Sequence, residues 1–139
     1  MARSSGDLKA HEAVAALAAL AALAKRREAG LRASLVRMTA AARDAAQAVA
    51  ESEEACETRR QAWRTALSRG GVYAQREVDG ATRSVEAARA ALGEAKTRHG
   101  AALEQVKQAD AALLQQRERL QANARKQEKL KALLALYRR

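Results

Sequence analysis

A seven-residue apolar repeat, unbroken by proline, most constrains how this chain can fold. One position of the repeat in the second half holds Val78, Val85, Leu92, His99, Val106, Leu113, Leu120, Gln127 and Leu134. The position three residues later holds Ala81, Ala88, Ala95, Ala102, Ala109, Gln116, Asn123, Leu130 and Tyr137. Residues at this spacing form the seam of a left-handed coiled coil. The repeat therefore predicts one long helix in the second half.

The first half carries a repeat of the same kind. Its two seam positions hold Leu35, Ala42, Val49, Cys56 and Trp63, with Leu31, Met38, Ala45, Ser52, Arg59 and Ala66 between them. Ser4, Ser5 or Asp7 can cap the amino end of such a helix, because their side-chain oxygens accept bonds from free backbone N–H groups. We predict a first helix over about residues 7–68.

The two repeats are separated by the glycine pair Gly70–Gly71, which favours a turn. The predicted turn covers about residues 69–73, and extends to 80 if Asp79–Gly80 also belongs to it. The second helix then runs to about residue 138. The expected fold is all-α, with residues 1–139 forming a single, long two-helix antiparallel coiled-coil hairpin. One continuous helix that dimerises in parallel fits the same repeat and remains the alternative.

Folding the chain at the glycine pair predicts a register in which large seam residues oppose small ones. Trp63 then faces Ala81, Val49 faces Ala95 and Ser52 faces Leu92. Such pairing lets two helices approach closely while the gap is filled. The polar layers expected in this register are Arg59 with Val85, Glu28 with Gln116 and Ala21 with Asn123.

The composition favours a thin seam over a thick core. Hydrophobic residues make up 48% of the chain, but aromatic residues only 2%, and Phe is absent. The longest apolar run, Ala13–Ala24, is shorter than the roughly 20 residues that span a bilayer. Its leucines recur every third residue, so part of the run should leave the seam and be exposed. With a lone Cys56, these features predict a cytoplasmic chain without membrane insertion.

The net charge of +10 is concentrated toward the two chain ends. Residues 1–43 have eight Lys/Arg and three Asp/Glu, and residues 117–139 have eight and two. Residues 44–116 have ten and eleven. A hairpin places the two basic stretches at the same end. They form either a solvated, helix-stabilising surface or an end that fits an acidic socket.

The sequence carries no pattern typical of an enzyme. His11 and His99 have no neighbours at metal-ligand spacing, and Cys56 falls in the seam as a small buried residue. The glycine pair lacks the lysine of a phosphate-binding loop. We expect no catalytic residue, no cofactor and no metal site. Nucleic-acid binding is favoured by charge alone, since aromatic residues for base stacking are almost missing.

The two equal arms, the basic termini and the run Arg125–Leu130 resemble the type III secretion central stalk family, which includes FliJ, YscO and HrpO. The resemblance covers essentially the whole chain. It implies an axle in the pore of a hexameric secretion ATPase that couples hydrolysis to the export gate. It also implies a place at the cytoplasmic face of the inner membrane, and some members bind export chaperones.

The resemblance also implies two contact sites. The ATPase would be bound by the basic end, at Lys25, Arg26, Arg27, Arg125, Lys126, Lys129 and Lys131. The export gate would be contacted by the turn, at Gly70, Gly71, Val72 and Tyr73. The other function compatible with these residues is a basic coiled-coil scaffold or a nucleic-acid-associated protein.

Overall fold

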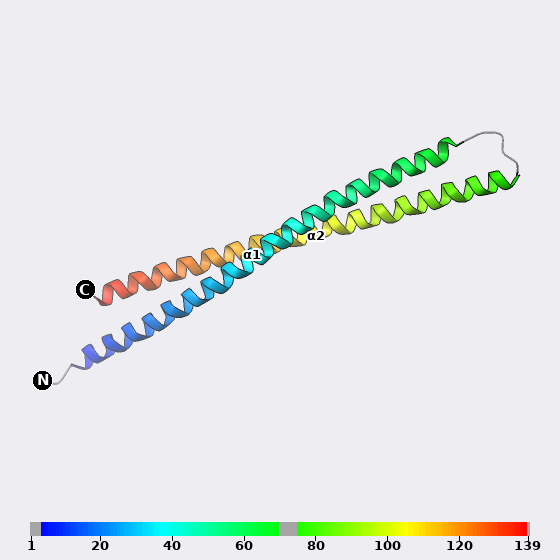
Figure 1. Cartoon of the computed structure of the whole chain (residues 1–139). Helices are drawn as coiled ribbons and strands as arrows, with labels where there is room; N and C mark the ends of the chain where they lie inside the picture. The colour runs from blue at the N-terminus through cyan, green and yellow to red at the C-terminus, as the bar shows by residue number, and fades with distance from the viewer. Residues whose placement is uncertain (1–3, 70–74, 139) are drawn as a thin grey trace. The chain divides into compact units, whose positions relative to one another are not determined.

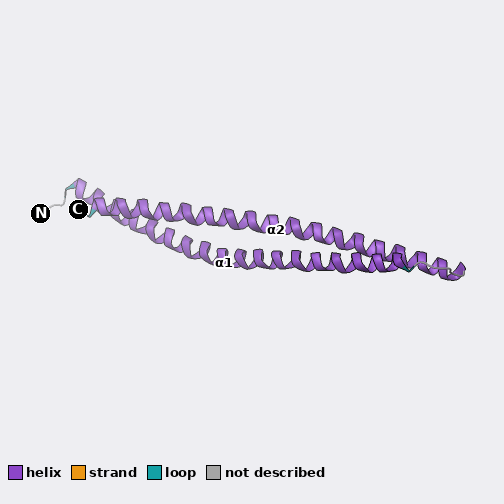
Figure 2. Cartoon of the chain, turned by 90° about the horizontal axis from the view of Figure 1, so that it is seen from above, coloured by secondary structure: helices purple, strands orange, loops and turns teal. Residues whose placement is uncertain are grey.

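The computed structural model describes residues 4–69 and 75–138. These residues form two helices, α1 (Ser5–Ser68) and α2 (Gln75–Tyr137), with no strand among them. The helices pack antiparallel to each other (Figure 1), and both are helical along their whole described length (Figure 2). The predicted all-α hairpin is therefore confirmed, and the single continuous helix is excluded.

The helix ends are set by local chemistry. The backbone N–H of Asp7 donates to Ser4 Oγ at 3.2 Å, so Ser4 caps α1. Because α2 already begins at Gln75, Asp79 and Gly80 lie inside it, and the longer of the two turns considered above is wrong. Residues 70–74 lie outside the described part of the chain.

The helices divide into two compact units. The terminal unit comprises residues 1–39 and 111–139, and the middle unit comprises residues 40–110. In the terminal unit, the first part of α1 packs against the last part of α2. In the middle unit, the last part of α1 packs against the first part of α2. Each unit is thus an antiparallel helix pair with its own section of the seam.

The burial pattern along α2 follows the predicted seam. Every seam position from Ala81 to Leu134 is buried or half-buried. Outside the seam, only Ala91 and Ala112 are shielded to a similar degree over this range. Val78 and Tyr137, at the two ends of the repeat, are exposed. The seven-residue period therefore identified the packed face of this helix.

The seam of α1 is also confirmed, except at one position. The predicted residues from Leu31 to Ala66 are buried or half-buried, but Arg59 is exposed. Its neighbour Arg60 is half-buried and forms an ion pair with Glu57 at 2.6 Å. A guanidinium in a thin apolar seam would lose hydration without gaining a partner, so Arg59 faces solvent. The predicted layer of Arg59 with Val85 is thus wrong.

The predicted register of α1 against α2 is wrong by one heptad in the middle unit. Ser52 Oγ is hydrogen-bonded to Nδ1 of His99 at 2.9 Å, whereas the predicted register placed Leu92, seven residues earlier, opposite Ser52. The terminal unit departs in the same direction. There Glu28 does not face Gln116, but accepts a hydrogen bond from Nε2 of Gln127 at 2.6 Å.

Polar residues within the seam explain this offset. In the predicted register, His99 would face Ala45 and Gln127 would face Leu17, neither of which offers a side-chain hydrogen bond. Leaving a buried polar group without a partner costs about 1–3 kcal/mol. In the observed register each of these groups has a partner on α1, while the apolar positions remain packed. The large-against-small rule cannot detect a shift of seven residues, because the repeat maps onto itself.

Two of the three leucines of the run Ala13–Ala24 leave the seam as expected, while Leu17 is half-buried. Leu20 is 45% and Leu23 is 39% exposed, whereas Ala24 is 2% exposed and forms the seam there. Only five apolar residues of the described chain are buried, namely Ala24, Cys56, Leu92, Ala95 and Leu130. The protein is therefore held by a thin seam. Neither α1 nor α2, as far as described, contains a stretch apolar and long enough for a bilayer.

Candidate protein-binding surface of the terminal unit

The terminal unit carries the whole net charge of the chain. By sequence it has fifteen Lys/Arg and five Asp/Glu, while the middle unit has eleven of each. The boundary between the units therefore separates a strongly cationic part from a neutral one. A local excess of this size raises the concentration of anionic partners near the surface and speeds their association.

The residues predicted to bind an ATPase all lie in this unit and are all exposed. Lys25, Arg26 and Arg27 belong to α1, and the others belong to α2, at Arg125, Lys126, Lys129 and Lys131. The structure brings two of them, Arg27 and Lys126, from different helices to one groove. The other five lie outside this groove.

The groove lies between α1 and α2 and has a volume of about 410 Å³. We call it the Gly30 groove. Its uncharged lining residues are Gly30, Leu31, Ala122 and Asn123, and its charged lining residues are Arg27, Arg119 and Lys126. A Cβ atom placed on Gly30 would meet nothing within 4 Å. The groove is therefore open because the residues that would fill it are small.

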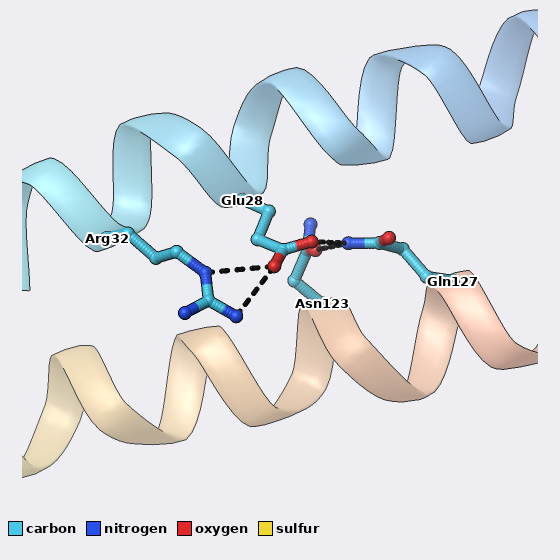
Figure 3. A network of polar contacts seen from close by, with 4 residues as sticks. All are labelled: Glu28, Arg32, Asn123 and Gln127. Carbon is cyan, nitrogen blue, oxygen red and sulfur yellow. Dashed lines mark hydrogen bonds and ion pairs between the residues drawn. The ribbon is translucent and has the colours of Figure 1, made fainter.

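A polar network joins the two helices beside this groove (Figure 3). Glu28 Oε2 accepts a hydrogen bond from Gln127 Nε2 at 2.6 Å, and the same nitrogen donates to Asn123 Oδ1 at 2.7 Å. Glu28 Oε1 accepts from Nε of Arg32 at 2.9 Å and pairs with its terminal nitrogen at 2.8 Å. Both carboxylate oxygens of Glu28 are thus occupied, and Asn123 links the network to the groove.

These contacts change the titration of Glu28. The hydrogen bond from Gln127, and next the one from Arg32, lower the pKa of the Glu28 carboxyl from its ordinary value of 4.5. Both donors favour the ionised form, because a carboxylate is the better acceptor. Glu28 is consequently an anion committed to its own network, and it leaves the cations of the groove uncompensated.

A second hydrogen bond fixes the helices nearby. Nε2 of Gln116, a residue only 3% exposed, donates to the backbone oxygen of Leu31 at 3.1 Å. Leu31 is also a lining residue of the Gly30 groove. The backbone of Leu31 on α1 and the side chain of Asn123 on α2, which both line the groove, are therefore each held by a hydrogen bond.

Grooves in the middle unit have a different electrostatic character. One, of about 320 Å³, is lined by the acids Glu53 and Glu57 together with the cations Arg60 and Lys96. Another is lined by the acid Glu94 together with Arg59 and Arg98. In each of these, acids accompany the bases. The Gly30 groove instead has three cations and no acid in its lining.

Sequence reasoning missed three residues of the groove, Gly30, Arg119 and Ala122. Arg119 lies seven residues before Lys126, so a heptad reading could have placed both on one face of α2. Gly30 plays no part in the predictions made from the sequence. Its role depends on which α2 residues lie opposite it, and the register needed for that inference was wrong.

The structure places Cys56 and His99, which the sequence also singled out, in the seam. Cys56 is free, 6% exposed and part of the seam. His99 is half-buried and bonded to Ser52. Among the described residues, no cluster of His, Cys, Asp or Glu could hold a metal ion. The residues expected to contact an export gate, Gly70 to Tyr73, lie outside the described part of the chain.

Comparison with known proteins adds no assignment. The chain matches no protein-family model, no curated protein sequence and no solved structure.

Proposed function

We propose that this protein is the central stalk of a type III secretion ATPase, an axle that binds in the pore of the hexameric enzyme. The observation that carries the proposal is the confinement of the net positive charge to the terminal unit. A stalk needs one end that is recognised by a ring, and an acidic pore would attract this end selectively.

The packing of the hairpin supports a mechanical role. Three seam contacts, Ser52 with His99, Glu28 with Gln127 and Gln116 with Leu31, connect the two helices at fixed positions. Polar contacts within an apolar seam specify register, because any slip leaves them unpaired. A helix pair that resists sliding can transmit a displacement.

Further contacts belong to the same proposal. Residues Gly70–Tyr73 would contact the export gate, and export chaperones would bind along the hairpin, at the cytoplasmic face of the inner membrane. The proposed ATPase contacts are the seven basic residues of the terminal unit described above. Catalysis would belong to the ATPase, and the stalk would act by binding alone.

The test is to mix the purified full chain with the secretion ATPase of the same organism. A stalk is expected to co-elute with the ATPase in gel filtration, to promote its hexamers and to raise its rate of ATP hydrolysis. The triple change of Lys25, Arg26 and Arg27 to Glu should abolish co-elution. A matched change of Arg43, Arg64 and Lys107 to Glu, which alters the net charge equally in the middle unit, should leave co-elution intact.

A nucleic-acid-associated scaffold is the competing function, and the same positive charge favours it. That protein would bind double-stranded DNA with an affinity that falls steeply with salt concentration. Tight DNA binding at physiological salt, with no effect on the ATPase, would reject the stalk and support the scaffold.

A further inference from the structure

The Gly30 groove has the features of an anchoring site for a side chain of another protein. Its lining is largely apolar and includes Gly30, Leu31 and Ala122. Asn123, only 8% exposed, adds one polar group, and its recorded hydrogen bond uses its side-chain oxygen. A concave apolar surface with a few fixed polar groups is the usual form of a binding site.

The charged residues around the groove define what it can accept. Arg27, Arg119 and Lys126 approach from both helices, and no acid lines the groove. The nearest network acid, Glu28, already has both of its oxygens engaged by Gln127 and Arg32. The three cations therefore lack a matching anion in the groove, and carboxylates of a partner would supply it.

We propose that the Gly30 groove binds an acidic helical segment of a partner protein, which inserts one large apolar side chain between α1 and α2. Carboxylates one helical turn before and after that side chain would meet Arg27 on one side and Arg119 and Lys126 on the other. The apolar anchor supplies affinity, and the surrounding charge pairs supply orientation and selectivity. If the partner is the ATPase, this identity rests on the proposed function above.

Filling the groove tests the proposal with little risk to the fold. Gly30→Leu places a side chain in the open space and favours the helix, because glycine is a poor helix former. Gly93→Leu is the matched control, since a Cβ at Gly93 also meets nothing within 4 Å but lies in the middle unit. Helix content and melting temperature, measured by circular dichroism, should be maintained in both variants.

The probe is a labelled, end-capped helical peptide of Glu and Ala with one central Phe, titrated by fluorescence anisotropy up to about millimolar protein. The wild-type chain and Gly93→Leu should bind it equally, and Gly30→Leu should bind at least about tenfold more weakly, as expected for a lost apolar contact. Replacing the central Phe of the peptide with Ala, or its Glu residues with Gln, should weaken binding similarly. No binding by the wild-type chain, or equal binding by Gly30→Leu, would overturn the proposal.

A charge variant tests the cations separately. Arg119→Gln should weaken peptide binding about two- to fivefold, the size of effect expected of an exposed ion pair. Arg117→Gln, which removes a nearby exposed cation of α2 outside the groove, should have less than half that effect. Equal losses in the two variants would show that general attraction, and not the groove, binds the peptide.

Two other occupants are distinguished by the same variants. Anionic phospholipid vesicles bound by the wild-type chain and lost only in Gly30→Leu would assign the groove to a lipid, and a concentration-dependent dimer lost in that variant would assign it to a second copy. Either result overturns the proposal. With the ATPase, wild-type binding that survives Gly30→Leu rejects the groove as the anchor but keeps the stalk. Absence of wild-type binding rejects the stalk, and the peptide titration then decides the groove alone.

Discussion

Ser52 of α1 and His99 of α2 are hydrogen-bonded across the seam, with Oγ and Nδ1 2.9 Å apart. The same hydroxyl donates to the backbone oxygen of Val49 at 2.8 Å. A serine hydroxyl has one hydrogen, so in this bond Nδ1–H of His99 is the donor and Ser52 Oγ is the acceptor. This pair fixes both the register of the middle unit and the tautomer of the histidine.

The register can be read by cross-linking. In a chain whose Cys56 is replaced by Ala, cysteines at positions 52 and 99 should form an intramolecular disulfide under mild oxidation. Cysteines at positions 49 and 95, which the large-against-small register would join, should stay reduced because a one-heptad offset is about 10 Å along the axis. Non-reducing electrophoresis and mass spectrometry distinguish the two. Efficient bridging of the second pair would restore the rejected register.

The Glu28 network should make stability depend on pH. Because the pKa of Glu28 is lowered in the folded chain, its contribution is complete above the unfolded value near 4.5 and is lost as pH falls through the folded value. Glu28→Gln should therefore reduce the loss of melting temperature between pH 7 and pH 3. Glu118→Gln, an exposed acid of the same unit, serves as the control and should retain the wild-type loss. Identical pH profiles for all three proteins would contradict a role for the network.

Replacing either of two helical glycines of α2 should stabilise the chain. Gly93 and Gly100 are exposed, and a Cβ on either would meet nothing within 4 Å. Replacing each with Ala should stabilise the chain by about 0.5–1 kcal/mol, because alanine loses less backbone freedom in a helix. Urea denaturation followed by circular dichroism measures the change. A loss of stability in either variant would indicate that the glycine is needed for a close approach.

Trp63 carries a structural cost in the middle unit. Its indole nitrogen is buried and has no hydrogen-bond partner. An unpaired buried donor costs about 1–3 kcal/mol. This cost offsets part of the stabilisation that burial of the apolar ring provides. Trp63→Phe should thus change the free energy of unfolding by less than about 1 kcal/mol, whereas Trp63→Ala should cost about 3 kcal/mol or more. A Phe variant as unstable as the Ala variant would show that the N–H is satisfied in solution.

The sequence predicted the helices and their packed faces, because periodicity is a local property. The positions of Leu92, Ala95 and Leu130 in the seam follow directly from the spacing of seven. The register could not follow from it, since sliding by seven residues exchanges equivalent positions. Only the matching of polar groups, such as Ser52 with His99, distinguishes registers that differ by seven residues. The predicted register rests on side-chain size instead.

The candidate site shows the same limit. The cations of the terminal unit could be recognised as a group, because charge is read directly from the residues. The Gly30 groove depends on Gly30 and Ala122 lying on facing helices, and on Glu28 being engaged elsewhere. These relationships require the correct register. An error of one heptad therefore hides a site although every helix is placed correctly.

The polar pairs of the seam also restrict which insertions and deletions the two helices can accept during evolution. A seven-residue insertion in α1 between Glu28 and Ser52 would leave the apolar pattern of each helix intact. It would nevertheless separate either Ser52 from His99 or Glu28 from Gln127, which hold different units. A compensating insertion in α2, between His99 and Gln127, would restore both contacts. The two arms should therefore lengthen or shorten only together, in matched heptads.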